Sequence, residues 1–129
     1  MKKKIDLSII IPLYNEENSI SNLFEEIKSN VSTSNWELIF INDGSTDNSK
    51  DIILDLINKN SNVKLIDSFN NKGKSEALNK GFQYCNGKIV ITMDADLQDD
   101  PSEIHNFIEV INNSNYDMSN SIEGNTSPT

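Results

Sequence analysis

The chain has 129 residues, 36% of them hydrophobic, and its twenty acidic side chains outnumber eleven lysines, with no arginine, for a formal charge of −9. This length fits one domain with a single core, and the acidity argues against a nucleic-acid-binding surface. The single cysteine, Cys85, excludes an internal disulfide, and no apolar stretch resembles a signal peptide or a membrane span. We therefore expect a cytoplasmic protein, and the three lysines after Met1 leave open a peripheral contact with a membrane.

Apolar residues follow two spacings in turn along the chain, and this predicts strands followed by helices. Short β-branched runs predict strands at residues 7–11, 36–41, 63–66 and 89–93. Apolar positions three and four residues apart predict helices over residues 20–31, 52–57, 77–85 and 101–112. In the third helix, Gly81 suits close packing against a neighbouring element. Asn, Ser and Thr dominate the end of the chain, so we expect a domain over residues 1–116 and a flexible tail over 117–129.

Strands that alternate with helices are typical of an α/β fold with an open, mainly parallel sheet and helices on both faces. Polar clusters follow the first, second and fourth predicted strands, at residues 14–16, 43–45 and 94–96. Because the carboxyl ends of parallel strands meet at one edge of the sheet, we expect these clusters to share that edge. If the strand order reverses beside the first strand, the first and fourth strands flank a crevice of the kind that binds ligands.

The densest group of acids follows the fourth strand, where four aspartates fall within seven residues: Asp94, Asp96, Asp99 and Asp100. Carboxylates this close would repel one another unless protons or a cation neutralised them. A hard divalent metal bound through oxygen is the simplest explanation. Asp100 is followed by Pro101 and Glu103, which fits a helix N-cap, so we assign Asp99 and Asp100 to capping or to solvent.

Two common nucleotide-binding motifs are absent from the sequence. No Gly-x-Gly-x-x-Gly follows the first strand, and no Gly-x-x-x-x-Gly-Lys-Ser/Thr occurs anywhere. An anionic small molecule would therefore depend on a metal, on helix N-termini and on a few lysines.

Four segments, in this order, resemble the family 2 glycosyltransferases with the GT-A fold: SIIIPLYNEE, INDGSTDNS, NKGKSEALNKGF and MDADLQDDP. The resemblance covers about residues 7–116, and the combination is specific, whereas Asp-x-Asp alone is a weak signal. The last segment is most similar to the branch that includes dolichyl-phosphate mannose synthase and bacterial polyprenyl-phosphate glycosyltransferases. The resemblance implies transfer of a sugar from a UDP- or GDP-linked donor, with a polyprenyl phosphate as the candidate acceptor.

The resemblance also implies the residues of the site. Mg²⁺ or Mn²⁺ would lie on the donor diphosphate, with Asp96, Gln98 and Asp94 as its candidate ligands. Asp94 and Ala95 would touch the nucleotide, and Lys74 would approach the phosphates. The other implied contacts are Pro12, Leu13, Tyr14, Asn15 and Glu16 beside the base and ribose, and Ile41 and Asp43 at the edge of the base.

The charges of the reactants agree with this resemblance. A diphosphate brings negative charge into an acidic site, so we expect it to bind together with a divalent metal. The metal would also neutralise charge on the departing nucleoside diphosphate. A phosphate acceptor, with a second pKa of about 6, is already ionised near neutral pH and needs no general base.

Simpler interpretations stand beside these roles. Residues 43–47 also fit a turn and helix cap with no ligand. Cys85 continues the apolar stripe of its helix, so we expect a small core residue and not a nucleophile. His105 lies off the apolar stripe of its helix, which predicts a surface position.

Catalytic domains of family 2 glycosyltransferases normally continue well beyond the Asp-x-Asp loop. This sequence resembles their nucleotide-sugar-binding half alone. Three hypotheses follow. The chain is a transferase whose acceptor site another subunit completes, a nucleotide-sugar-binding remnant without turnover, or a signalling receiver domain. A receiver needs a phosphorylatable Asp after its third strand and a Lys after its fifth, and this pattern is not met, so we rank it third.

The fourth strand is the most apolar in the chain, and the absent half would normally cover its edge. An uncovered edge of this kind favours pairing with another chain. We therefore expect a homo-oligomer whose interface includes this edge or the helix over residues 101–112.

Overall fold

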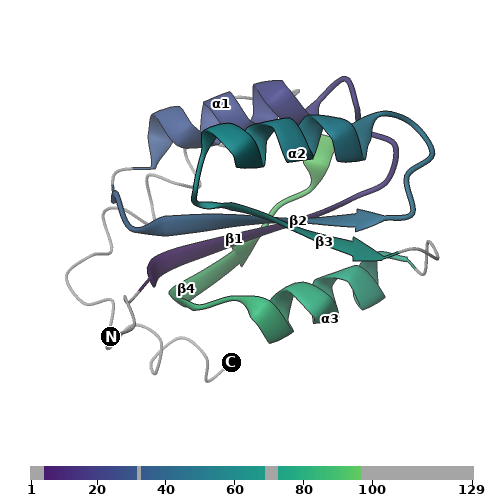
Figure 1. Cartoon of the computed structure of the whole chain (residues 1–129). Helices are drawn as coiled ribbons and strands as arrows, with labels where there is room; N and C mark the ends of the chain where they lie inside the picture. Colours follow the sequence, from purple (N-terminus) through teal and green to yellow (C-terminus); the bar gives the residue numbers. More distant parts are fainter. Residues whose placement is uncertain (1–4, 32, 69–72, 97–129) are drawn as a thin grey trace.

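The computed structural model describes residues 5–31, 33–68 and 73–96 (Figure 1). Its elements in chain order are β1 (Ile5–Leu13), α1 (Ile20–Asn30), β2 (Trp36–Asp43), α2 (Ser49–Lys59), β3 (Val63–Ser68), α3 (Lys74–Tyr84) and β4 (Gly87–Thr92). Each lies where the hydrophobic spacing predicts it. The first three strands each end two residues later than predicted, so that Asp43 is the last residue of β2 and not part of the following turn. The predicted helix at 101–112, His105 and the tail lie outside the described residues.

All strands of the sheet are parallel, in the order β3-β2-β1-β4. Leu7 of β1 pairs with Trp36 of β2 on one side and with Ile89 of β4 on the other. The Met93 N–H donates to the Ile10 carbonyl and extends the pairing past the end of β4. The order therefore reverses beside β1, which confirms the condition under which the first and fourth strands become neighbours.

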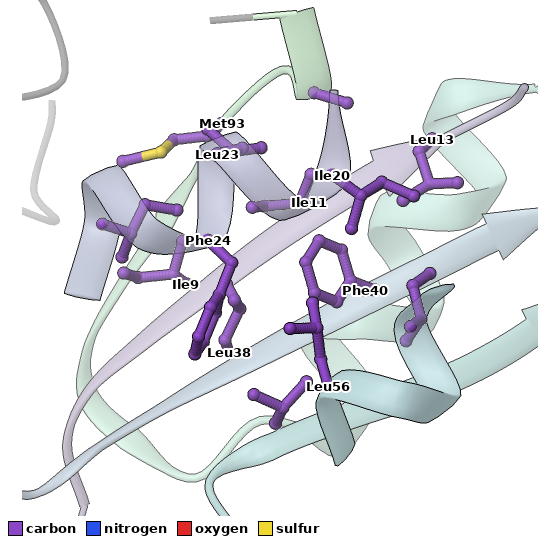
Figure 2. Packing of buried hydrophobic residues seen from close by; sticks show 14 of the residues in the cluster. Ile9, Ile11, Leu13, Ile20, Leu23, Phe24, Leu38, Phe40, Leu56 and Met93 are labelled. Carbon is purple, nitrogen blue, oxygen red and sulfur yellow. The ribbon is translucent and has the colours of Figure 1, made fainter. Parts of the chain in front are cut away.

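The main core lies between the sheet and the helices α1 and α2, which cover one face (Figure 1). Figure 2 shows Phe24 of α1 and Leu56 of α2 packed over Leu38 and Phe40 of β2. Helical spacing brings the apolar residues of α1 to one side, and they are all buried. Each such side chain stabilises the fold by about 1.5–3 kcal/mol relative to exposure. This burial holds β1 in the middle of the sheet.

A smaller core lies on the opposite face, under α3. Ile10, Ile39 and Ile41 pack there against Ala77. Gly81 brings the helix close to the sheet, because a Cβ atom at this position would lie 2.5 Å from Ile10 Cγ2. Cys85 is half-buried against the same cluster, and burial, with a smaller contribution from the charge of Glu37, raises the pKa of its thiol. The thiol is thus kept protonated, as expected for a packing residue.

A buried carboxylate fixes the start of β4. The Glu37 side chain is 1% exposed and accepts hydrogen bonds from Ser8 Oγ (2.5 Å), Lys64 Nζ (2.6 Å) and the Asn86 N–H (2.7 Å). The Gly87 N–H donates to Ser8 Oγ at 2.7 Å. Burial by itself raises the pKa of Glu37, but these hydrogen bonds hold the pKa below its ordinary value of 4.5. The ionised form therefore stabilises the junction of β1, β2 and β4.

Within the described residues, no helix is both long enough and apolar enough to cross a membrane.

The lowered pKa of Glu37 predicts a stability contribution that is present above the ordinary pKa and is lost as the pH falls through the lower, folded-state pKa. Glu37→Gln should reduce the free energy of unfolding by about 1–3 kcal/mol at neutral pH, because an amide cannot accept from all three donors. The deficit should shrink as the pH falls below the ordinary pKa. Urea unfolding of both proteins across this range measures it.

Glu25→Gln is the matched control, because Glu25 lies exposed on α1. It should leave the pH profile unchanged. A Glu37→Gln deficit that stays constant with pH would contradict a role for the charge.

Candidate functional site

An open pocket of about 440 Å³ lies where the carboxyl ends of β1, β2 and β4 meet the start of α3. Its lining comes from four separate parts of the chain: Pro12, Leu13, Tyr14, Glu16, Asp43, Gly73, Lys74, Ala77, Asp94, Ala95 and Asp96. The polar clusters predicted to share one edge of the sheet therefore converge. Asn15 and Ile41, two other predicted contacts, do not line it, and Gln98 lies outside the described residues.

One wall of the pocket is the end of β1 and the loop that follows. Pro12 and Leu13 are buried, whereas the Tyr14 side chain is 43% exposed and Glu16 is half-buried. Ile41, one strand away, is fully buried in the core under α3. Its side chain therefore has a packing role in this structure.

Asp43 joins the end of β2 to the start of α3. Asp43 is buried, and its Oδ2 atom accepts a hydrogen bond from the Gly73 N–H at 2.9 Å. Gly73 has φ +101° and ψ 167°, a region that is essentially restricted to glycine. This contact brings the first residue of α3, Lys74, to the pocket. Asp47, also in the predicted turn, precedes the N-cap residue Asn48, and its Oδ1 accepts a hydrogen bond from the N–H of Ser49, the first residue of α2, at 2.9 Å.

The opposite wall is the acidic segment after β4. Ala95 is buried, and the flanking side chains of Asp94 and Asp96 are exposed in the pocket. Lys74 Nζ forms an ion pair with Asp94 Oδ1, in which the two side chains are 59% and 56% exposed. An ion pair this exposed contributes little to stability, because water solvates both partners well. Separating Lys74 from Asp94 therefore costs little free energy.

The two aspartates fit part of a divalent metal site. Carboxylate oxygens are the ligands that Mg²⁺ and Mn²⁺ prefer, and Mg²⁺ commonly takes one or two carboxylates together with waters and phosphate oxygens. Among the described residues, no three acidic, histidine or cysteine side chains are grouped to hold a metal. Asp94 and Asp96 would therefore supply a partial set of ligands that leaves positions for a phosphate.

Sequence reasoning missed Gly73 and Ala77 as parts of the pocket. The sequence signals were a glycine four residues before the predicted helix, for Gly73, and a small residue at the start of that helix, for Ala77. In the structure Gly73 directly precedes α3 and Ala77 lies one turn into it. A larger hollow of about 630 Å³ lies between β3 and α3, beside Leu65, Lys80 and Tyr84. It contains none of the predicted site residues, so the smaller pocket is the better candidate.

Gly73→Ala should reduce the free energy of unfolding by about 1–3 kcal/mol, because alanine is strained in this backbone region. The space itself is open, with no atom within 4 Å of an added Cβ, so the cost comes from the backbone alone. Thermal or urea unfolding measures it. Ser75→Ala, at an exposed position two residues later, is the control and should change stability by less than about 0.5 kcal/mol. Equal stability of Gly73→Ala and the wild type would contradict the strain.

Comparison with known proteins connects this chain to one family. An undecaprenyl-phosphate 4-deoxy-4-formamido-L-arabinose transferase of Pseudomonas fluorescens is 38% identical over 106 residues, which are 80% of this chain and 31% of that protein. The mannosyltransferase PcManGT from Pyrobaculum calidifontis, solved with GDP-Man and Mn²⁺, has a TM-score of 0.66 at 24% identity, over 73% of this chain and 28% of that one. This second likeness shows the fold alone.

A further solved structure is glucosyl-3-phosphoglycerate synthase from Mycobacterium tuberculosis in complex with Mn²⁺, UDP and glucosyl-3-phosphoglycerate. It has a TM-score of 0.58 at 26% identity, over 71% of this chain and 34% of that one. The chain thus spans about a third of the length of the proteins it matches. The family model for glycosyl transferase family 2 matches residues 8–121, and the chain belongs to this family, as its GT-A fold and strand-end pocket also indicate.

Proposed function

We propose that this chain forms the nucleotide-sugar-binding part of a metal-dependent glycosyltransferase. The observation that carries the proposal is the convergence of Asp94, Asp96 and Lys74 with the end of β1 around one pocket. The synthase with 26% identity binds UDP and Mn²⁺ together, which supports a nucleoside diphosphate and a divalent metal as ligands here.

The charges of the pocket support the proposed requirement for a metal. Among the described residues, the lining carries four acidic side chains and one cationic side chain, that of Lys74; the acids are Glu16, Asp43, Asp94 and Asp96. A diphosphate would meet strong repulsion in such a site unless a divalent cation lay between the two sets of anionic oxygens. Mg²⁺ and Mn²⁺ both suit carboxylate and phosphate oxygens.

The residues of the chain then have distinct parts in the reaction. Asp94 and Asp96 would hold the metal, which when bound neutralises charge on the departing nucleoside diphosphate. Lys74 would leave Asp94 and turn toward the phosphates. This movement would be short, because Lys74 and Asp94 line the same pocket in which the phosphates would bind. Tyr14 and Glu16 would face the base and ribose from the end of β1.

We propose a polyprenyl phosphate as the acceptor for the whole protein. The support is the 38% identical relative, which is named as an undecaprenyl-phosphate transferase. A phosphate oxygen is already ionised near neutral pH, with a second pKa of about 6, and needs no general base from the protein. Because the chain spans about a third of such relatives, donor binding without transfer is the second candidate function for this stretch alone. The family match replaces the receiver-domain hypothesis.

Calorimetry with UDP and GDP tests the proposal. At least one of the two nucleotides should bind in the presence of Mn²⁺. Its affinity should fall about tenfold or more, equivalent to about 1.4 kcal/mol, when a chelator replaces the metal. Asp96→Asn should cause a similar loss without lowering the melting temperature, since Asp96 is exposed. Asp51→Asn removes the same charge from an exposed position on α2 and should bind as the wild type does. Equal affinity in Mn²⁺ and in chelator would contradict the metal.

A second experiment tests the exchange of partners by Lys74. In Lys74→Gln, Mn²⁺ alone should bind more tightly, because Asp94 loses its cationic partner, whereas the nucleoside diphosphate with Mn²⁺ should bind about three- to tenfold more weakly. Lys59→Gln is the control, because Lys59 pairs with Asp55 on the exposed side of α2. If both variants change the two affinities equally, net charge is the cause and not the pairing with Asp94.

A further inference from the structure

Asn15 has an uncommon backbone conformation beside the pocket. Its φ of 55° makes it the one non-glycine residue with positive φ in the described part of the chain. The left-handed region costs most residues about 1–2 kcal/mol, and asparagine is tolerated there because its short polar side chain can hydrogen-bond locally. Its neighbours Tyr14 and Glu16 both line the pocket, whereas Asn15 does not.

The side chain and backbone of Asn15 hold three consecutive residues of the loop between β2 and α2. The Asn15 N–H donates to Ser45 Oγ at 2.8 Å. Asn15 Oδ1 accepts from the N–H groups of Thr46 (2.8 Å) and Asp47 (3.2 Å). Asn15 Nδ2 donates to Thr46 Oγ1 at 3.3 Å. One residue therefore joins two loops that lie thirty positions apart in the sequence.

The next two residues continue this contact between the loops. The Glu16 N–H donates to Ser49 Oγ at 2.9 Å, and Ser49 is fully buried at the start of α2. Glu17 exchanges bonds with the same loop, because its N–H donates to Asp47 Oδ2 (3.2 Å) and its Oε1 accepts from the Asn48 N–H (2.9 Å). We call the contact between residues 15–17 and 45–49 the loop clasp. It fixes the backbone on both sides of Glu16.

We propose that Asn15 is a positioning residue for nucleotide binding, which acts through Tyr14 and Glu16 and does not itself contact the nucleotide. The left-handed turn directs Asn15 toward the clasp and leaves the side chains before and after it in the pocket. This inference rests on the proposed function of the pocket. It assigns Asn15 a different role from the direct substrate contact that the sequence suggested.

The location of the clasp separates this role from a contribution to overall stability. The hydrogen bonds of Asn15 are solvent-exposed, so water can replace them at little cost in global unfolding free energy. Their loss should instead release the local geometry of the loop, since exposed segments open with less free energy than the core. Nucleotide affinity should then fall more than the melting temperature does.

Two variants distinguish the backbone from the side chain. Asn15→Gly keeps the backbone conformation and removes the acceptor, whereas Asn15→Asp keeps an acceptor oxygen for Thr46 and Asp47 and removes the Nδ2 donor. In calorimetry with UDP or GDP and Mn²⁺, Asn15→Gly should bind about fivefold or more weakly and Asn15→Asp within about threefold of the wild type. Asn18→Gly, at an exposed position of the same loop outside the pocket lining, should bind normally.

Two outcomes would overturn the positioning role of Asn15, and a third would contradict the proposed function on which it rests. Wild-type affinity of Asn15→Gly would exclude a positioning role. Equal losses in Asn15→Gly and Asn15→Asp would exclude the clasp as the cause, because only Asn15→Gly removes the acceptor for the Thr46 and Asp47 N–H groups. Absence of wild-type binding to either nucleotide would contradict the proposed function instead.

Amide hydrogen exchange tests the clasp without any nucleotide. In Asn15→Gly, the N–H groups of Glu16, Thr46 and Asp47 should exchange faster while those of β1 keep their wild-type protection. Unchanged exchange at these three positions would overturn the proposal whatever the calorimetry shows.

Discussion

The structure depends on the parallel pairing of β1 with β2 on one side and β4 on the other. Because all three strands point the same way, their carboxyl ends meet at one edge, and residues far apart in sequence line one pocket. The packing of α1 and α2 over one face and of α3 over the other keeps β1 central (Figure 1). The hydrophobic effect thus stabilises the arrangement, and strand direction decides where the chemistry lies.

Two ionic interactions of the structure differ in burial and in role. Glu37 is buried, has several donors and fixes the start of β4, so its charge serves the fold. Lys74 and Asp94 form an exposed pair in the pocket, which contributes little to stability and can be broken by a ligand. The first kind of interaction holds the strand that carries the acidic segment. The second leaves that segment available for binding.

To bind an anionic nucleotide, as proposed, an acidic protein needs local sources of positive charge. With a formal charge of −9, the chain as a whole repels a diphosphate at long range. Within the described residues, the pocket gathers Lys74 and the start of α3 near Asp94 and Asp96. A divalent metal on the two aspartates would complete the balance, which is why the proposed donor and metal are coupled. The clasp around Asn15 adds the shape of the opposite wall.

The sequence by itself determined the elements, the α/β class and the placing of acids after the fourth strand, because hydrophobic spacing and the order of turns are local properties. From the sequence, a reversal of strand order beside β1 was only a condition for the predicted crevice. The tertiary structure decided that β2 and β4 are the neighbours of β1. The resemblance to a known family implied direct contacts for Ile41 and Asn15, whereas the fold buries Ile41 under α3 and bonds Asn15 to residues 45–47. Spacing shows whether a side chain is apolar and periodic, but hydrogen bonds between loops thirty residues apart depend on which strands the core brings together.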